Sequence, residues 1–258
     1  MAAVATAGAR HLFVVTGTSR GMGAAIAKRL LASPDHLVLC LARHTNAALA
    51  AAGGAGKCEQ WAADLAAPTD AAARLSAWLE ALDPSSLASA TLINNAATLT
   101  RIGPIEDCSD AELSTALRVG LEAPLLLSAA FLRATRGWRA ARRVLNISSG
   151  LGRRAMAGQA AYCATKAGMD HLSRALALDE AQRPNGAKVV SLAPGVIDTD
   201  MQTALRTGDP AGFPEQANFI ALKENGQLTS PDDAAARVLA YLDRADFGAN
   251  PVADVREP

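Results

Sequence analysis

The sequence contains, close to its N-terminus, the stretch Thr16-Gly17-Thr18-Ser19-Arg20-Gly21-Met22-Gly23. It follows an apolar run that predicts a buried strand (His11–Thr16) and precedes a segment with helical spacing (Gly21–Ala32). Glycines at this junction permit positive φ, let a phosphate approach the backbone and let the helix pack close to the strand. The helix N-terminus presents free N–H groups and a positive dipole end to an anion. An ordinary glycine-rich turn is the alternative, but the position after the first strand favours a nucleotide phosphate site.

Outward from this turn, the chain alternates short apolar runs with longer helical segments. Further strands are predicted at Leu37–Ala42, Gln60–Ala63, Thr91–Asn94, Arg143–Ser148 and Lys188–Leu192. Helices are predicted at Asp70–Leu82, Asp110–Leu117, Ala123–Thr135, Ala161–Gln182 and Pro231–Arg244. This alternation with continuously apolar strands indicates a parallel sheet covered by helices on both faces. The predicted fold class is therefore α/β, a doubly wound parallel sheet of the Rossmann type.

The composition supports one large domain. The chain has 258 residues, of which 50% are hydrophobic, 4% aromatic and 19% charged, so a sizeable core of small aliphatic side chains is expected. No proline-rich linker divides the chain, which predicts a single domain over residues 1–258 with a loose tail at 1–9. A loop rich in proline and glycine is predicted beside a site at Gly208–Asn218. The 25 basic and 25 acidic residues balance, which argues against binding nucleic acid or an anionic membrane through net charge.

No segment resembles a targeting or membrane-spanning sequence. The longest strongly apolar run near mid-chain (Ala123–Leu132) is about half as long as a membrane crossing. The four cysteines contain no CxxC pair, and the four histidines show no metal-ligand spacing, so no metal site is expected. A reducing, cytoplasmic setting is the expected environment.

The end of the second predicted strand carries a basic residue, Arg43, where dinucleotide-binding folds place the adenosine ribose. An acidic residue at this point would accept hydrogen bonds from the ribose 2′-hydroxyl and select NAD. Arg43, together with Arg20 of the glycine turn, is instead suited to hold a 2′-phosphate. Solvated surface arginines are the alternative reading, but together with the missing acid the pair favours NADPH.

Three side chains form a candidate proton-transfer site. Tyr162 and Lys166 lie one helical turn apart on one face of a predicted helix. A tyrosine has an ordinary pKa of about 10, and a nearby ammonium is expected to lower that pKa by stabilising the phenolate. Such a phenol can protonate a carbonyl oxygen as hydride reaches the carbon. Ser149, at the end of a strand, is placed to donate to the same oxygen, whereas Ser148 is expected to point elsewhere.

These motifs resemble, in order and spacing, those of the short-chain dehydrogenase/reductase family over nearly the whole chain. The matching segments are the glycine turn, Asp64-Leu65, Asn94-Asn95-Ala96-Ala97, the Ser149, Tyr162 and Lys166 set, and Pro194-Gly195. The resemblance implies that Ser149, Tyr162 and Lys166 are catalytic. It also implies a cofactor site formed by Gly17, Ser19, Arg20, Gly21, Met22, Gly23, Arg43, Asp64, Leu65, Asn95, Ala96, Tyr162, Lys166, Pro194, Gly195, Ile197 and Thr199.

Within the family, the chain is most similar to sepiapterin reductases, for example in Asp198-Thr199-Asp200-Met201-Gln202. This implies NADPH-dependent reduction of a pterin side-chain ketone or α-dicarbonyl, a small-molecule carbonyl substrate, and a homodimer or homotetramer. In that subfamily a C-terminal aspartate anchors the pterin, and Asp254 is the candidate here; a solvated terminal acid is the alternative. The expected substrate residues are Ser149, Tyr162, Gly195, Met201 and Asp254.

Two features near the site leave alternatives open. Family members carry an asparagine that holds a water linking the lysine to solvent, and the match places Gly120 there. A glycine costs about 1 kcal/mol of helix stability relative to alanine but leaves space for water. The missing asparagine leaves a cofactor-binding regulatory protein with weak turnover as an alternative, and a diketone or ketone reductase of the same family without a pterin role is a further alternative. Arg153 and Arg154 are expected at the mouth of the site, either attracting an anionic or polar substrate or forming a solvated loop.

Overall fold

A seven-stranded, wholly parallel sheet forms the centre of the protein, in the order β3-β2-β1-β4-β5-β6-β7. The computed structural model describes residues 10–51 and 56–257; the tail expected at 1–9 lies outside the described residues. The strands are β1 (His11–Thr16), β2 (His36–Ala42), β3 (Lys57–Ala62), β4 (Ser89–Asn94), β5 (Ala141–Ile147), β6 (Lys188–Ala193) and β7 (Val252–Asp254).

The strand order places a switch point at the middle of the sheet. From β1 the chain moves outward through β2 to β3, then crosses back to β4 on the other side of β1 and continues outward to β7. In sheets of this kind, ligands bind beyond the carboxyl ends of the strands at the point where the order reverses. The doubly wound parallel sheet and the single domain predicted from the sequence are confirmed.

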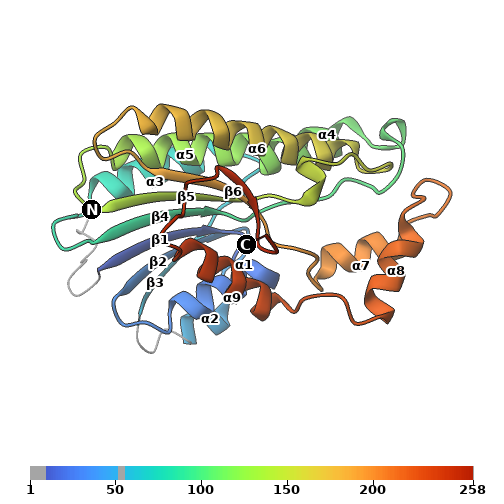
Figure 1. Cartoon of the computed structure of the whole chain (residues 1–258), viewed down its shortest axis with the longest axis horizontal. Coiled ribbons are helices and arrows are strands. Elements are labelled where there is room, and N and C mark those ends of the chain that lie inside the picture. Colours follow the sequence, from blue (N-terminus) through green and yellow to red (C-terminus); the bar gives the residue numbers. More distant parts are fainter. Residues whose placement is uncertain (1–9, 52–55, 258) are drawn as a thin grey trace.

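Helices cover both faces of the sheet (Figure 1). The helices α3, α4, α5 and α6 lie on one face, and α1, α2 and α9 lie on the other. Their bounds are α1 (Gly21–Leu30), α2 (Ala47–Ala51), α3 (Pro68–Glu80), α4 (Asp110–Leu117), α5 (Ala123–Ala134), α6 (Ala160–Ala181), α7 (Asp200–Thr207), α8 (Gln216–Glu224) and α9 (Pro231–Leu242). Short turns complete the chain: the 3-10 turns η1 (Ile105–Asp107) and η3 (Gly150–Gly152), and the π-helical turn η2 (Arg118–Glu122).

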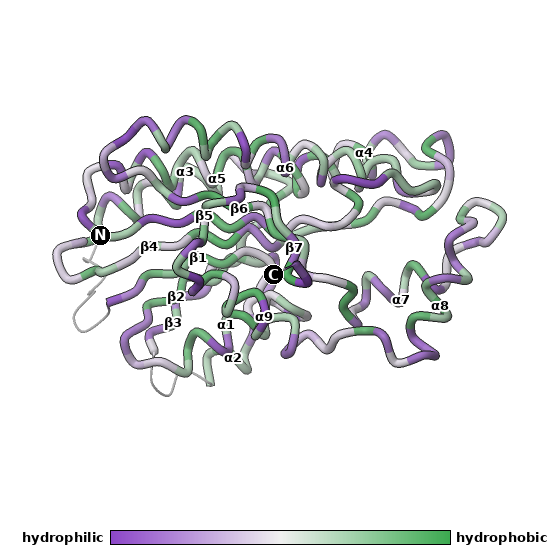
Figure 2. The backbone as a smooth tube through the Cα atoms, in the orientation of Figure 1, coloured by the Kyte–Doolittle hydropathy of each residue, from purple (hydrophilic) through white to green (hydrophobic). Residues whose placement is uncertain are grey.

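The two faces of the sheet bury separate apolar cores because successive strand residues point in opposite directions. In β1, Leu12 and Val14 pack into the core shared with α3 and α5, whereas Phe13 and Val15 pack into the core shared with α1 and α9. In Figure 2, green hydrophobic stretches run through the central part of the sheet, among paler and hydrophilic segments. This double burial explains why the strands read as continuous apolar runs rather than as alternating patterns.

One stretch is long and apolar enough to cross a membrane by length and composition, namely Asp110–Ala134, which comprises α4, η2 and α5. In the structure α5 packs against α3, and α4 packs against α6. Side chains such as Leu127 and Phe131 are fully buried in the core beneath. The stretch therefore has the packing of a core helix.

The segment between β6 and α9 differs from the prediction. Two helices, α7 and α8, flank the Pro- and Gly-rich turn inside the predicted loop (Gly208–Asn218), and they project beyond the carboxyl ends of the strands (Figure 1). The turn is anchored because Phe213 is completely buried and stacks on Phe219, with ring centroids 5.6 Å apart. The proline and glycine residues mark only the break between the two helices.

Candidate active site

The glycine turn connects β1 to α1 in a conformation that other residues do not readily adopt. Gly17 and Gly21 have φ values of +76° and +59°, a region where only glycine avoids a steric penalty. Gly23 has no room for a side chain, because a Cβ there would lie 2.2 Å from the Gly17 carbonyl oxygen. The turn therefore brings the backbone of the chain and the N-terminus of α1 together at the carboxyl edge of the sheet, as a phosphate cradle requires.

The end of β4 is bound to this turn across the switch point. The Thr16 hydroxyl oxygen accepts hydrogen bonds from the backbone N–H groups of Asn95 and Ala96, at 2.9 and 3.0 Å. The Asn95 side-chain amide in turn donates to the Thr16 carbonyl oxygen at 2.9 Å. The predicted Asn95-Ala96 motif thus supports the shape of the glycine turn, and Thr16 is a supporting residue that the sequence analysis did not single out.

The predicted adenosine end of the site is polar and exposed. Arg43 follows β2 directly and is exposed. Arg20 forms an exposed ion pair with Asp200 at 2.6 Å. The Asn46 side chain donates to the Ser19 carbonyl oxygen at 3.2 Å and so links the loop after β2 to the glycine turn. Asn46 was not predicted, because nothing in the spacing connects it to residue 19.

Two further predicted cofactor residues follow β3. Asp64 is exposed, and its carboxylate accepts the backbone N–H of Ala66 at 2.9 Å, which shapes the turn before α3. Leu65 is 6% exposed and belongs to the core. Met22 is likewise buried, in the core on the α1 side.

The three predicted catalytic side chains come together at the carboxyl end of β5. Ser149 precedes η3, and its hydroxyl oxygen accepts the Leu151 backbone N–H at 3.2 Å. The Ser149 and Tyr162 side chains are hydrogen-bonded to each other. The Lys166 ammonium lies 5.5 Å from the centroid of the Tyr162 ring and donates to the Ile147 carbonyl oxygen at 2.6 Å. The arrangement holds a hydroxyl, a phenol and an ammonium around one point.

Burial dominates the acid–base properties of this set. Desolvation raises the pKa of Tyr162 to about 12, although the hydrogen bond from Ser149 acts in the opposite direction. Desolvation also lowers the pKa of Lys166 to about 8, and the Asp170 carboxylate partly opposes this shift. The pKa of Tyr162 is thus raised, whereas a neighbouring ammonium was expected to lower it. Removing water from around the phenolate destabilises it more than the neighbouring groups stabilise it.

Ser148 points away from the three predicted catalytic side chains, as expected from the sequence. Its hydroxyl donates to the Asp170 carboxylate at 2.5 Å. Asp170 was not identified from the sequence, since a single acid on a helix carries no signal of its depth. Arg153, expected at the mouth of the site, instead reaches toward Asp170 and toward the Ala253 carbonyl oxygen, at 3.7 and 3.4 Å. Arg154 is exposed.

The loop after β6 comes close to the glycine turn. Gly195 has a φ of +85°, and a Cβ there would meet no atom within 4 Å, so the backbone borders open space beside Pro194. Further along, a Cβ on Gly21 would lie 3.6 Å from the Thr199 methyl group. Ile197 pairs with Thr229 through an isolated parallel bridge. The loop therefore extends from the end of β6 to the glycine turn.

The two remaining predicted substrate residues lie on different elements, α7 and β7. Met201 lies in the first turn of α7 and is partly buried. Asp254 ends β7, is 5% exposed and forms an ion pair with Arg256 at 2.6 Å. It borders a hollow of about 210 Å³ that also contacts Tyr241 and contains none of the three predicted catalytic side chains. The Asp254 carboxylate is thus engaged within the chain.

Gly120 lies in the π-helical turn η2 and is buried against α6. A Cβ at residue 120 would lie 2.9 Å from the Cβ of Thr165, the residue before Lys166. The space expected for water beside this glycine is therefore occupied by the Thr165 side chain. The lack of a side chain at residue 120 and the bulk of Thr165 are complementary.

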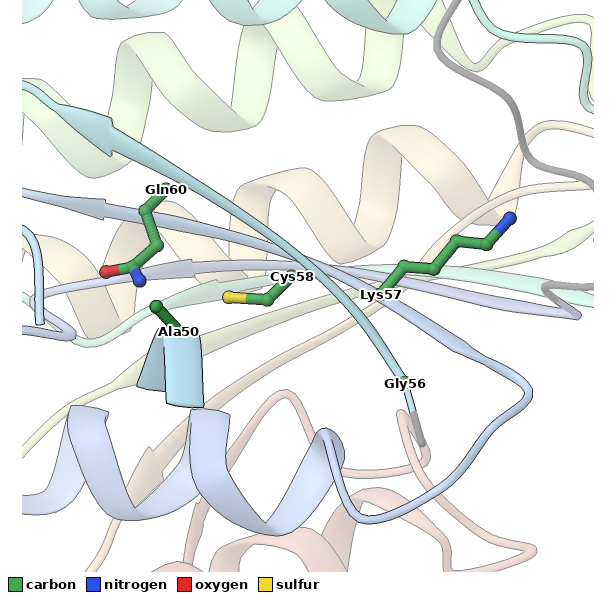
Figure 3. Close-up of a pocket in the computed structure, with 5 residues that line it drawn as sticks. All are labelled: Ala50, Gly56, Lys57, Cys58 and Gln60. Carbon is green, nitrogen blue, oxygen red and sulfur yellow. The ribbon is translucent and has the colours of Figure 1, made fainter. Parts of the chain in front are cut away.

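A hollow of about 560 Å³ lies at the β3 edge of the sheet, between α2 and β3 (Figure 3). Figure 3 shows Cys58 and Gln60 pointing toward Ala50 of α2, with Lys57 pointing away. The Gln60 side chain exchanges hydrogen bonds with the Asn46 backbone, at 2.7 and 3.1 Å. Gln60, which lines the hollow, therefore anchors the loop after β2.

Comparison with known proteins agrees with this geometry. A family model described as short chain dehydrogenase matches residues 11–210. A benzil reductase ((S)-benzoin forming) from Bacillus cereus is 34% identical over 236 residues, covering 91% of this chain and 94% of the relative. A sepiapterin reductase from Meriones unguiculatus is 32% identical over 246 residues, covering 91% and 92%.

Solved structures give the same assignment. A metagenomic short-chain oxidoreductase in complex with NADP is 27% identical with a TM-score of 0.68, covering 97% of this chain and 96% of its own. A 3-oxoacyl-[acyl-carrier protein] reductase from Brucella melitensis in complex with NAD is 25% identical with a TM-score of 0.76, and the coverage is 95% of both chains. The parallel sheet, the glycine turn and these matches together show that the chain belongs to the short-chain dehydrogenase/reductase family, with similarity to its benzil and sepiapterin reductases.

Proposed function

We propose that this oxidoreductase is an NADPH-dependent carbonyl reductase that acts on an α-dicarbonyl compound, with an aromatic 1,2-diketone as the favoured substrate. One observation carries the proposal. The Ser149 hydroxyl, the Tyr162 phenol and the Lys166 ammonium gather at the carboxyl end of β5, beside the open backbone at Gly195. That combination supplies a proton donor and an oxygen-orienting group next to space for a ligand.

The chain offers a fitting site for a nicotinamide dinucleotide. The pyrophosphate would lie on the backbone of Gly17 and Gly21 at the N-terminus of α1, where a side chain at either residue would strain a positive-φ backbone. Arg43, which is exposed, and Arg20, which would exchange its exposed ion pair with Asp200 for the ligand, are the cations placed to hold a 2′-phosphate, and this favours NADPH over NADH. Pro194, Gly195 and Thr199 would border the nicotinamide, which supplies the hydride when bound.

The residues of the chain then account for the proton and for the orientation of the carbonyl. The Ser149 hydroxyl would donate to the substrate oxygen and hold it beside the Tyr162 phenol. The phenol of Tyr162, with its pKa at about 12, stays protonated near neutral pH and so acts as the acid. The Lys166 ammonium, fixed by the Ile147 carbonyl oxygen, would stabilise the phenolate that remains after proton transfer.

The diketone is preferred to a pterin because of the C-terminal segment. The benzil reductase from Bacillus cereus has a 1,2-diketone in its name and is 34% identical. A pterin would need a carboxylate to accept its paired N–H groups, and the Asp254 carboxylate is held by Arg256. A pterin side-chain carbonyl remains the second candidate, favoured by the 32% identity to a sepiapterin reductase.

A substrate panel tests the proposal. The purified chain is mixed with NADPH and, in separate reactions, with benzil, sepiapterin and a simple ketone, and each reaction is repeated with NADH. Faster NADPH oxidation with benzil than with sepiapterin supports the proposed substrate. Faster oxidation with sepiapterin transfers the assignment to a pterin carbonyl, and equal rates with NADH contradict the assigned cofactor. No oxidation with any of the carbonyls would contradict the proposed function.

The proposal includes association of the chain with copies of itself. Three large apolar side chains are exposed on the face covered by α4, α5 and α6: Leu117 (46%), Leu125 (43%) and Leu178 (70%). These exposed apolar side chains on one face of the molecule support the proposal that this face binds another copy of the chain. We expect a homodimer or homotetramer, which light scattering of the purified protein distinguishes from a monomer.

A further inference from the structure

A buried carboxylate lies one turn beyond Lys166 on α6. Asp170 is 1% exposed. One of its oxygens, Oδ1, accepts hydrogen bonds from the Ser148 hydroxyl at 2.5 Å and from the Ser191 hydroxyl at 2.7 Å. Ser148 precedes Ser149 at the end of β5, and Ser191 lies on β6. A single acid therefore joins the catalytic helix to two neighbouring strands directly beneath the candidate site.

The second oxygen of this carboxylate, Oδ2, faces the turn that follows Ser149. A Cβ on Gly152 would lie 2.6 Å from Oδ2, so the η3 backbone rests directly on the carboxylate. The Arg153 guanidinium approaches the same oxygen at 3.7 Å. Among the described residues, Oδ2 accepts no hydrogen bond, although it is buried. Burial of a carboxylate oxygen without a hydrogen bond is costly, and Arg153 supplies the compensating charge.

These contacts enclose the segment that carries the serine. Ser148 on one side of Ser149, and Gly152 and Arg153 on the other, all contact the Asp170 carboxylate. Arg153 also donates to the Ala253 carbonyl oxygen of β7 at 3.4 Å, which extends the connection to the last strand. A shift of the carboxylate would move the turn between β5 and α6, and with it the Ser149 hydroxyl.

We propose that Asp170 is a positioning residue for carbonyl reduction, because its carboxylate holds residues 148–153 against α6 and so aims the Ser149 hydroxyl at the Tyr162 phenol. The inference rests on the proposed function for its kinetic consequences. Asp170 does not touch the reacting atoms in this arrangement, since its oxygens are turned to Ser148, Ser191 and Arg153. Its effect on the reaction passes through the geometry of Ser149 and through the charge it places near Lys166.

The negative charge of Asp170 can be detected through its effect on the pKa of Lys166. Lys166 shares α6 with Tyr162 and Asp170, and the η3 turn brings Arg153 close to Asp170. The elements packed against α6 carry further charged groups, which are either exposed or already paired. These groups are Arg118 and Glu122 of η2, Asp110 and Glu112 of α4, Lys188 of β6, and Asp254 of β7 with its partner Arg256. Asp170 is a charged neighbour that raises the pKa of Lys166, against the lowering caused by burial.

The main test compares Asp170→Asn with a matched control, Glu180→Gln. Glu180 is also a buried, ion-paired acid on α6, held by Arg142 at 3.0 Å, but lies toward the opposite end of the helix. In the Asp170→Asn variant we expect kcat to fall between about tenfold and about a hundredfold, as misplacement of a catalytic group does. We also expect the alkaline limb of the kcat/KM profile to move to lower pH, because the Lys166 ammonium loses a neighbouring negative charge. Glu180→Gln should lower stability without moving this limb.

A second variant keeps the test valid if Asp170→Asn does not fold. Arg153→Gln alters a partly exposed side chain and removes the positive charge that faces Asp170. The Asp170 charge then acts on Lys166 with less compensation, so the alkaline limb should move to higher pH, opposite to Asp170→Asn. Shifts in opposite directions would not result from a merely structural role of either residue.

A measurement without substrate separates this inference from the proposed function. Titration of the Lys166 ammonium by NMR in ¹⁵N-lysine-labelled protein should show a lower pKa in Asp170→Asn and a higher pKa in Arg153→Gln than in the unaltered chain. If the unaltered chain reduces no carbonyl, the proposed function is wrong, but this titration still tests whether Asp170 and Arg153 act on the pKa of Lys166. Unchanged Lys166 titrations in both variants, or a kcat loss in Glu180→Gln equal to that in Asp170→Asn, would overturn the inference.

Discussion

The backbone of Gly120 and the side chain of Thr165 are packed so closely that a Cβ at residue 120 would lie 2.9 Å from the Thr165 Cβ. This contact joins the π-helical turn η2 to α6 directly before Lys166. A glycine in the middle of a helical stretch usually costs stability. Here the glycine is required by the residue that faces it.

The contact predicts that Gly120→Ala destabilises the protein, although alanine is the better helix former. We expect a loss of about 1–3 kcal/mol in the free energy of unfolding, the usual cost of overpacking a tight interior. Gly137→Ala is the matched control, because a Cβ there meets no atom within 4 Å. Chemical denaturation of both variants measures the difference, and equal stabilities would contradict the packing argument.

The glycine turn makes a separate prediction for cofactor affinity. In Gly23→Ala, the new methyl group would collide with the Gly17 carbonyl oxygen, since the Cβ would lie 2.2 Å from it. The turn must open, so NADPH binding should weaken by about tenfold or more, equivalent to at least about 1.4 kcal/mol. Fluorescence titration with NADPH checks this, and Gly137→Ala should bind as the unaltered chain does. Unaltered affinity in Gly23→Ala would exclude this turn as the phosphate site.

Arg43 is expected to set the preference for NADPH. Arg43→Glu places a carboxylate at the end of β2, where it would repel a 2′-phosphate and accept hydrogen bonds from a ribose hydroxyl. The loss of a charge-assisted contact of about 1.5–3 kcal/mol should lower kcat/KM with NADPH by about tenfold or more. Arg136→Glu has the same change in charge at an exposed residue beyond α5 and is the control. If the ratio of kcat/KM with NADPH to kcat/KM with NADH is unchanged in Arg43→Glu, Arg43 does not contact the cofactor.

The pH dependence of reduction should follow Lys166. Its pKa of about 8 means that the ammonium is present below this pH and is lost as the pH rises through it. Tyr162 keeps its phenolic proton over the same range, because its pKa is about 12. We therefore expect kcat/KM for carbonyl reduction to be level below pH 8 and to fall above it. In Lys166→Arg the charge persists, so the activity that remains should show no such fall. A level profile for the unaltered chain through the alkaline range would contradict this assignment.

The regular elements were predictable because the helix or strand propensities of their residues agree with the burial that the fold gives them. The bounds of β1 and α4 match the prediction, since each has a clear beginning and end in the sequence. The strand β3 was predicted too short because it is an edge strand whose first residues, Lys57-Cys58-Glu59, are polar or only partly buried. The three-residue strand β7 was missed because so short a run has no pattern of its own.

The candidate site was predictable only where a motif identifies it. The Tyr162 and Lys166 pair follows from helical spacing, and Ser149 from its place at a strand end. The burial of the Asp170 carboxylate and the pairing of Asp254 with Arg256, two residues later, required the structure, because neither depth nor the choice of ion-pair partner leaves a periodic signal. The pKa of Tyr162 differed from the prediction for the same reason, since desolvation depends on depth.

The most direct test of the account is replacement of the proposed acid by Tyr162→Phe, followed by measurement of NADPH oxidation with benzil and of NADPH binding. Loss of the acid should reduce kcat by about a hundredfold to ten-thousandfold while the affinity for NADPH stays the same. Tyr241→Phe on α9, the only other tyrosine of the chain, should leave kcat unchanged. A Tyr162→Phe variant that turns over benzil as fast as the unaltered chain would contradict the central claim that Tyr162 supplies the proton.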